Sequence, residues 1–62
     1  MYSYIWLCKM MQDRGGVNLI SGNQVYSGTI NGIAVEDGSG KNWLVSLALF
    51  GGGHKTIFVK AE

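Results

Sequence analysis

The segment NWLVSLALF, residues 42–50, is the stretch of sequence that decides the fold. Its apolar side chains alternate with a period of two residues, which is typical of a β-strand. One face is entirely apolar and consists of Trp43, Val45, Leu47 and Leu49. The other face carries Leu44, Ala48 and Phe50 beside Ser46. Apolar residues on both faces predict the central strand of a sheet.

Turn-forming residues bound this segment on both sides. Residues 37–41 (DGSGK) precede it, and residues 51–53 (GGG) follow it. Residues 54–60 then predict a last strand, with Ile57 and Val59 on one face and Phe58 on the other. Because the connections are short, we expect neighbouring strands to pair antiparallel.

Residues 24–36 predict one long strand whose apolar phase slips. Val25 and Ile33 fall on one face, whereas Ile30 falls on the other. Such a slip would turn every later side chain to the wrong face of the sheet. We therefore expect a β-bulge at Asn31-Gly32.

The N-terminal segment allows two interpretations. Residues 2–11 carry aromatic and apolar side chains at both even and odd positions, which favours a strand buried on both faces. A helix is the alternative, because Tyr4, Leu7, Cys8 and Met11 fall at helical spacing. We identify no capping residue for such a helix and predict a strand. Residues 12–16 (QDRGG) then predict a turn whose glycines take positive φ.

Residues 17–20 predict a short strand, and residues 21–23 (SGN) predict a tight hairpin turn. The expected fold is a single all-β domain over residues 1–62. It is a five-stranded antiparallel meander, in the form of a small SH3-like barrel or a strongly twisted sheet.

Composition predicts that the chain associates with itself. A domain of 62 residues is near the lower limit for a self-supporting core. Cys8 is the only cysteine and His54 the only histidine, so neither an internal disulfide nor a four-ligand zinc site can form. Apolar residues make up 47% of the chain and charged residues 15%, against about 25% charged in soluble domains. Copies of the chain would cover the surplus apolar surface as a homo-oligomer, unless an N-terminal helix covers the sheet.

The net charge and the N-terminal sequence limit the expected partners and location of the protein. The formal net charge is +1 without a basic run, which makes nucleic acid a less expected partner. No stretch approaches the roughly 18 apolar residues of a membrane span, so we expect no membrane partner. The opening MYSYIWLCKMM has neither a basic leader nor a cleavage site, and Cys8 fits a reducing compartment. We expect a cytoplasmic protein.

Candidate ligand-binding residues lie in the loops and among the aromatics. Successive glycine N–H groups can hold an anion, so Gly51, Gly52 and Gly53 with His54 and Lys55 form one candidate site. The alternative is a mobile hairpin loop with a solvated lysine. A base or another flat ligand can stack on Trp43 or Tyr26, with Lys41 as a further contact.

The leading functional hypothesis is a non-enzymatic binding protein. We expect no catalytic residues, cofactor or metal, because no catalytic or metal-binding pattern occurs in the sequence. Such a homo-oligomer would sequester or block a protein or a small nucleotide-like ligand, as a phage or mobile-element inhibitor of a host system does. The alternatives are a small RNA- or DNA-binding barrel and a structural assembly protein. A steep dependence of binding on salt would identify the first alternative.

One family resemblance bears on that alternative. The pattern consists of Val17-x-Leu19-x-x-Gly22, Gly28-x-Ile30, Asp37, Asn42 and Phe58-Val59-Lys60. It loosely resembles the Sm-like RNA-binding barrels, over about two-thirds of the chain. The spacings from Gly22 to Gly28 and from Asp37 to Asn42 are each one residue longer than in that family. The resemblance implies that Asn42 and Lys60 contact RNA in a ring.

Overall fold

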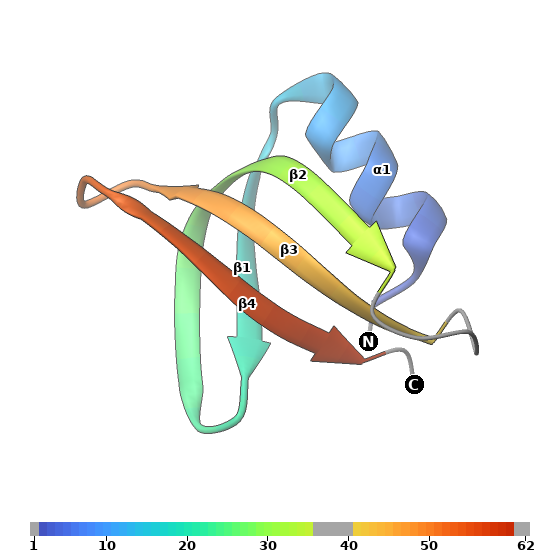
Figure 1. The fold of residues 1–62 in the computed structure, drawn as a ribbon. Helices are drawn as coiled ribbons and strands as arrows, with labels where there is room; N and C mark the ends of the chain where they lie inside the picture. The colour runs from blue at the N-terminus through green and yellow to red at the C-terminus, as the bar shows by residue number, and fades with distance from the viewer. Residues whose placement is uncertain (1, 36–40, 61–62) are drawn as a thin grey trace.

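The computed structural model describes residues 2–35 and 41–60, which form a helix followed by one open sheet of four antiparallel strands (Figure 1). The elements are α1 (Tyr4–Asp13), β1 (Gly16–Ser21), β2 (Gln24–Val35), β3 (Asn42–Leu49) and β4 (His54–Lys60). The strand order in the sheet is the order along the chain, which confirms the antiparallel meander. The prediction of a small antiparallel β-sheet protein is confirmed, whereas the fifth strand and the barrel are wrong, because residues 4–13 form a helix and the sheet is open. The turn expected at residues 37–41 lies outside the described residues except for Lys41.

The predicted N-terminal strand is a helix, and Ser3 caps its N-terminus. The Ser3 side chain accepts a hydrogen bond from the Trp6 backbone N–H at 3.1 Å. This bond satisfies one of the donors that a helix leaves unpaired in its first turn. The helical spacing of the apolar residues then directs Leu7 toward the sheet, where it is fully buried. Our sequence interpretation overlooked this cap.

The end of α1 corrects a second expectation. The helix runs to Asp13, and Arg14 takes the left-handed conformation with φ 55°. The Arg14 and Gly15 N–H groups donate to the carbonyls of Met11 and Met10 at 3.2 and 3.0 Å. Positive φ therefore occurs at Arg14 and not at Gly15 or Gly16. The left-handed conformation allows these N–H groups to bond the last free carbonyls of the helix.

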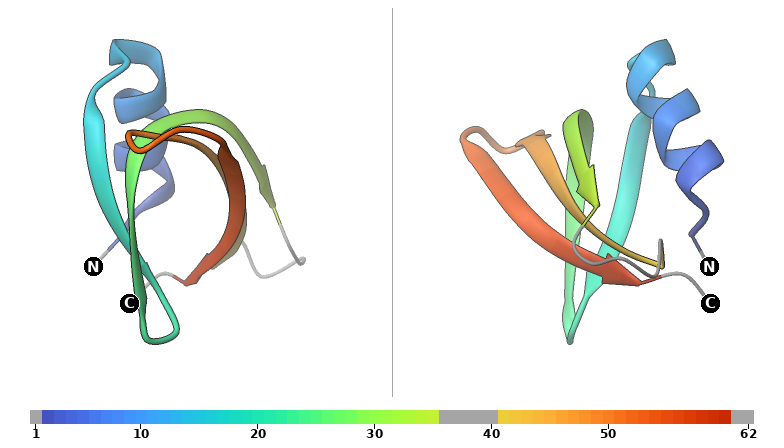
Figure 2. Two further views of the ribbon diagram at one scale, coloured as in Figure 1. Left: turned by 90° about the vertical axis from the view of Figure 1, so that its left-hand side faces the viewer. Right: turned by 45° about the vertical axis from the view of Figure 1, so that its right-hand side comes forward.

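Two local predictions in β1 and β2 are confirmed. Ser21 pairs with Gln24 across a two-residue turn, in which Gly22 has φ 63°. The register of β2 against β3 shifts between Ile30 and Gly32, so a β-bulge lies at the predicted place. It bends β2 strongly, and the sheet curls around its own inner face (Figure 2).

The buried core lies on this inner face, where the three central side chains of β3 are almost fully covered. Its members are Leu7, Val17, Leu19, Ile30, Trp43, Val45, Leu47, Ile57 and Val59. Helix α1 packs chiefly against β2, and its Leu7 side chain lies in the core. The two sheet edges approach at one point, where the Ser21 hydroxyl donates to the Phe58 carbonyl at 2.9 Å, but β1 and β4 do not pair.

Candidate functional site

The predicted glycine-rich site is a tight hairpin turn between β3 and β4. The Leu49 N–H donates to the Gly53 carbonyl at 2.9 Å, and the Gly52 N–H donates to the Leu49 carbonyl at 3.0 Å. Gly52 and Gly53 have φ of 101° and 83°, so the turn requires glycine at both positions. The Gly52 N–H is therefore occupied within the turn. Gly51 and His54 are exposed beside it.

Two of the predicted ligand residues do meet in space. The Lys55 ammonium lies 5.8 Å from the centroid of the Tyr26 ring. Tyr26 pairs with the buried Leu19 on β1, and Lys55 pairs with the buried Leu47 on β3, so both belong to the inner face. They meet where the sheet curls. A cation at this distance from a ring is weakly attracted to it, and the arrangement leaves the ammonium exposed.

Trp43 and Lys41 do not join this pair. Trp43 is 2% exposed, and its ring lies 6.1 Å from that of Tyr4 on α1. It stands four residues before Leu47, the partner of Lys55, which is about 13 Å along the strand. Lys41 is exposed and directly precedes β3, at the Trp43 end. The structure thus places the predicted ligand residues at two ends of the sheet.

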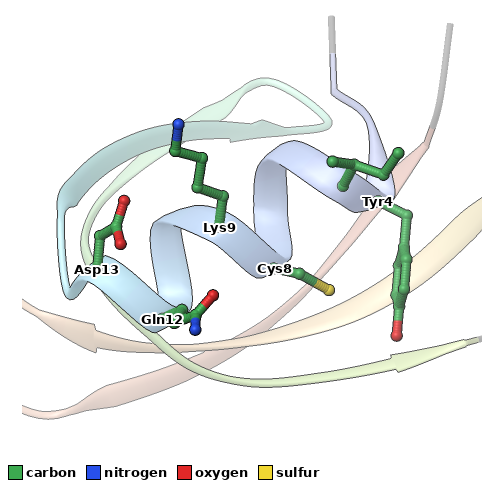
Figure 3. A pocket seen from close by; sticks show the side chains of 6 residues that line it. Tyr4, Cys8, Lys9, Gln12 and Asp13 are labelled. Carbon is green, nitrogen blue, oxygen red and sulfur yellow. The ribbon is translucent and has the colours of Figure 1, made fainter.

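A shallow hollow of about 560 Å³ lies on the solvent side of α1, lined by Tyr4, Ile5, Cys8, Lys9, Gln12 and Asp13 (Figure 3). Cys8 points to the side on which the Tyr4 ring lies, whereas Lys9 points away from both. A hydrogen bond with the Cys8 thiol, and the repulsion between the two groups when ionised, raise the pKa of Tyr4 above its usual value. The phenol is therefore stabilised in its neutral form. The side chains do not converge on one point.

The outer face of the sheet carries an apolar row that sequence reasoning recognised only in part. Ala34, Leu44 and Phe58 are register partners across β2, β3 and β4, and we call them the outer row. Leu44 is 36% exposed and Phe58 37% exposed, although both are large apolar side chains. The alternation of β3 and β4 already assigned Leu44 and Phe58 to this face.

The neighbouring row of the outer face is small and uncharged. It consists of Gly32, Ser46 and Thr56, which are also register partners. Because Gly32 has no side chain, a shallow hollow of about 380 Å³ forms between the two rows. On the far side of the outer row, Asn42 pairs with Lys60, whose ammonium lies 5.9 Å from the Phe58 ring. The outer face therefore presents an apolar surface, and the Lys60 ammonium lies at its margin.

Helix α1 changes the argument for self-association. It covers the inner face, as Leu7 is fully buried and Tyr2, Met10 and Met11 pack against the core. An uncovered inner face therefore no longer supports the expectation of a homo-oligomer. Large apolar side chains nevertheless remain exposed on the helix, the hairpins and the outer row: Tyr4, Ile5, Trp6, Ile20, Val25, Leu44, Phe50 and Phe58.

Other classes of site find no support in the described part of the chain. Over residues 2–35 and 41–60, no three or more His, Cys, Asp or Glu side chains lie close enough together to hold a metal ion. No helix in those residues has the length and apolar character that crossing a membrane requires. Comparisons with protein-family models, characterised proteins and solved structures found no match.

Proposed function

We propose that this chain is a non-enzymatic binding protein whose copies associate through the outer row. The observation that carries the proposal is the exposure of Leu44 on β3 and of Phe58 on the edge strand β4, on a sheet face that no described element covers. Burying such side chains stabilises a complex by about 25 cal/mol for each Å² of apolar surface removed from water. A contiguous exposed apolar patch with polar residues at its margin is typical of an association surface.

The size of the molecule supports a second copy as the partner. The total accessible surface is 4079 Å². A stable interface needs about 800 Å² from each partner, which is about a fifth of that surface. The Cα atoms span 32 × 26 × 17 Å, so the broad faces of the molecule are of comparable area. A two-fold contact would place the outer rows of two copies against each other.

Sedimentation equilibrium of three forms of the full chain tests this proposal. We expect the wild type to associate in the micromolar range and Leu44→Thr/Phe58→Thr to remain monomeric, because threonine keeps strand propensity but removes apolar surface. Val25→Thr is the matched control, since Val25 is exposed on the other hairpin and lies outside the outer row. A monomeric wild type, or a double variant that associates as the wild type does, would contradict the proposal.

A second candidate function is RNA binding, and one specific observation favours it. Asn42 and Lys60, the residues to which the Sm-like resemblance assigns RNA contacts, are direct partners across β3 and β4. The exposed Phe58 ring lies beside Lys60 and is available for base stacking.

Fluorescence anisotropy with single-stranded oligouridylate tests this second function. We expect Lys60→Gln to weaken binding and to reduce the salt slope by about one phosphate contact. Lys9→Gln on α1 is the control, because Lys9 lies away from this face. Binding that does not depend on salt would exclude an electrostatic RNA contact.

The proposed location is the cytoplasm. Cys8 is a free thiol and is partly exposed. Exposed thiols persist in a reducing compartment and are oxidised outside it.

A further inference from the structure

The connection between α1 and β1 is short and conformationally unfavourable. Only Arg14 and Gly15 separate Asp13, the last helical residue, from Gly16, the first residue of β1. Arg14 has φ 55° and is the one non-glycine residue with positive φ in the described ranges 2–35 and 41–60. A side chain with a Cβ atom is disfavoured in this conformation. Met10 packs close to Gly15, which has no side chain, so Gly15 lets the chain pass beside the end of the helix.

The contacts between α1 and the sheet do not depend on this connection. Leu7 is fully buried against the sheet, and the Ile20 N–H donates to the Tyr2 hydroxyl at 2.7 Å. The Tyr4 ring packs beside the Trp43 ring. Each contact joins a side chain near the N-terminus to a strand that follows the connection. The helix of a second copy would make the same contacts if it docked in the same place.

We infer that two copies of this chain exchange their α1 helices. In the exchanged dimer, each helix covers the inner face of the other copy's sheet, and the contacts of the monomer are retained. Arg14 then no longer reverses the chain and leaves the left-handed conformation. A short connection under strain favours such an exchange, and mutual exchange closes as a two-fold dimer. The inference rests on the proposed self-association and adds an interface that does not involve the outer row.

Refolding of the full chain from urea at high protein concentration, followed by dilution and size-exclusion chromatography, tests the exchange. Refolding allows helices to redistribute between copies, and the exchanged dimer then dissociates slowly on dilution. We expect a dimer peak for the wild type. Arg14→Gly should raise the dimer dissociation constant about 30-fold, because glycine adopts positive φ freely and each of two connections contributes about 5-fold.

Two variants that lengthen or shorten the connection between α1 and β1 should change the dimer fraction in opposite directions. Four residues (Gly-Ser-Gly-Ser) inserted after Arg14 should abolish the dimer, since the longer connection reverses without strain. Deletion of Gly15 should make the dimer the main species, because the shortened connection can no longer return α1 to its own sheet. The same four residues inserted after Gly51, in the β3–β4 turn, should leave the dimer fraction unchanged. Circular dichroism of each form shows whether it has folded.

Three results would overturn the exchange, and the third comes from the outer-row variant. One is a wild type that elutes only as a monomer after concentrated refolding. Another is a dimer fraction that neither Arg14→Gly nor the insertion after Arg14 changes, and this comparison stands even if the deletion variant fails to fold. The double variant Leu44→Thr/Phe58→Thr separates the two proposals. After concentrated refolding it should still form the exchanged dimer. When it is purified without unfolding, it should no longer associate through the outer row. Loss of both in that variant would assign all association to the outer row and overturn the exchange.

Discussion

Both faces of β3 carry large apolar side chains, but the surroundings of the two faces differ. On the inner face, Trp43, Val45 and Leu47 are at most 2% exposed, whereas Leu44 on the outer face is 36% exposed. The difference arises outside the strand, because the sheet curls around its inner face and α1, packed chiefly against β2, inserts Leu7 into the core. Apolar alternation therefore predicts which residues share a face. It does not predict which face is covered.

Removal of the largest inner side chain should show this difference most strongly. We expect Trp43→Ala to lower the free energy of unfolding by about 3–5 kcal/mol, because it leaves a cavity in the core. Leu44→Ala, one residue along the same strand, should cost about 1 kcal/mol or less. Urea unfolding at one fixed protein concentration compares the two variants, since association itself adds stability. Equal losses would mean that the two faces of β3 are equally buried.

The helix can be tested separately through Leu7. Leu7→Ala should lower the free energy of unfolding by about 2–5 kcal/mol. A chain of 62 residues has roughly 3–9 kcal/mol in total, so this variant should lose a large share of its stability and melt at a much lower temperature than the wild type. Ile5→Ala is the control on the same helix, because Ile5 is 81% exposed. Thermal unfolding by circular dichroism measures both, and a Leu7→Ala variant with the melting temperature of the wild type would contradict docking of α1.

A smaller effect is expected where β2 and β3 approach most closely. A Cβ atom at Gly28 would overlap the backbone carbonyl of Ala48, so Gly28→Ala must push the two strands apart. We expect a loss of about 1–3 kcal/mol in the free energy of unfolding. Gly32→Ala on the same strand should be tolerated, since its Cβ would make an ordinary contact with Ser46 Cβ at 3.7 Å. A destabilised Gly32→Ala beside a stable Gly28→Ala would show that the curl is placed wrongly.

The smallest effect concerns the cap that converts the N-terminal segment into a helix. Ser3→Ala removes the acceptor for the Trp6 N–H and should cost about 1 kcal/mol. Ser3→Asp keeps an acceptor and should retain the stability of the wild type. Denaturant unfolding of the two variants checks this expectation. A neutral Ser3→Ala would mean that packing of Leu7 alone holds the helix.

Most of the sheet could be predicted from the sequence because its signals are local. The Ser21–Asn23 turn, the bulge at Asn31-Gly32 and the strand after Gly53 all follow from turn residues and a period of two. The helix was missed because apolar residues occur at both parities in residues 2–11, which fits a strand as well as a helix. The bond from the Trp6 N–H to Ser3 and the burial of Leu7 against the sheet favour the helix.

The candidate site was less predictable because it depends on tertiary contacts. Tyr26 and Lys55 meet only because the sheet curls, and Trp43 was assigned to a ligand site although the core surrounds it. The outer row needs three strands in register, of which the sequence indicates only the separate faces. The left-handed conformation at Arg14 was also not predicted, because glycine adopts it with less strain and two glycines follow directly. The residue that adopts it is set by where α1 ends.

A dilution series followed by NMR of the side chains tests most directly whether the outer row is the surface on which copies meet. The account predicts that the methyl signals of Leu44 and the ring signals of Phe58 shift with protein concentration, while those of Leu7 and Val45 stay fixed. Spectra that are independent of concentration and have the linewidths of a single subunit would contradict it.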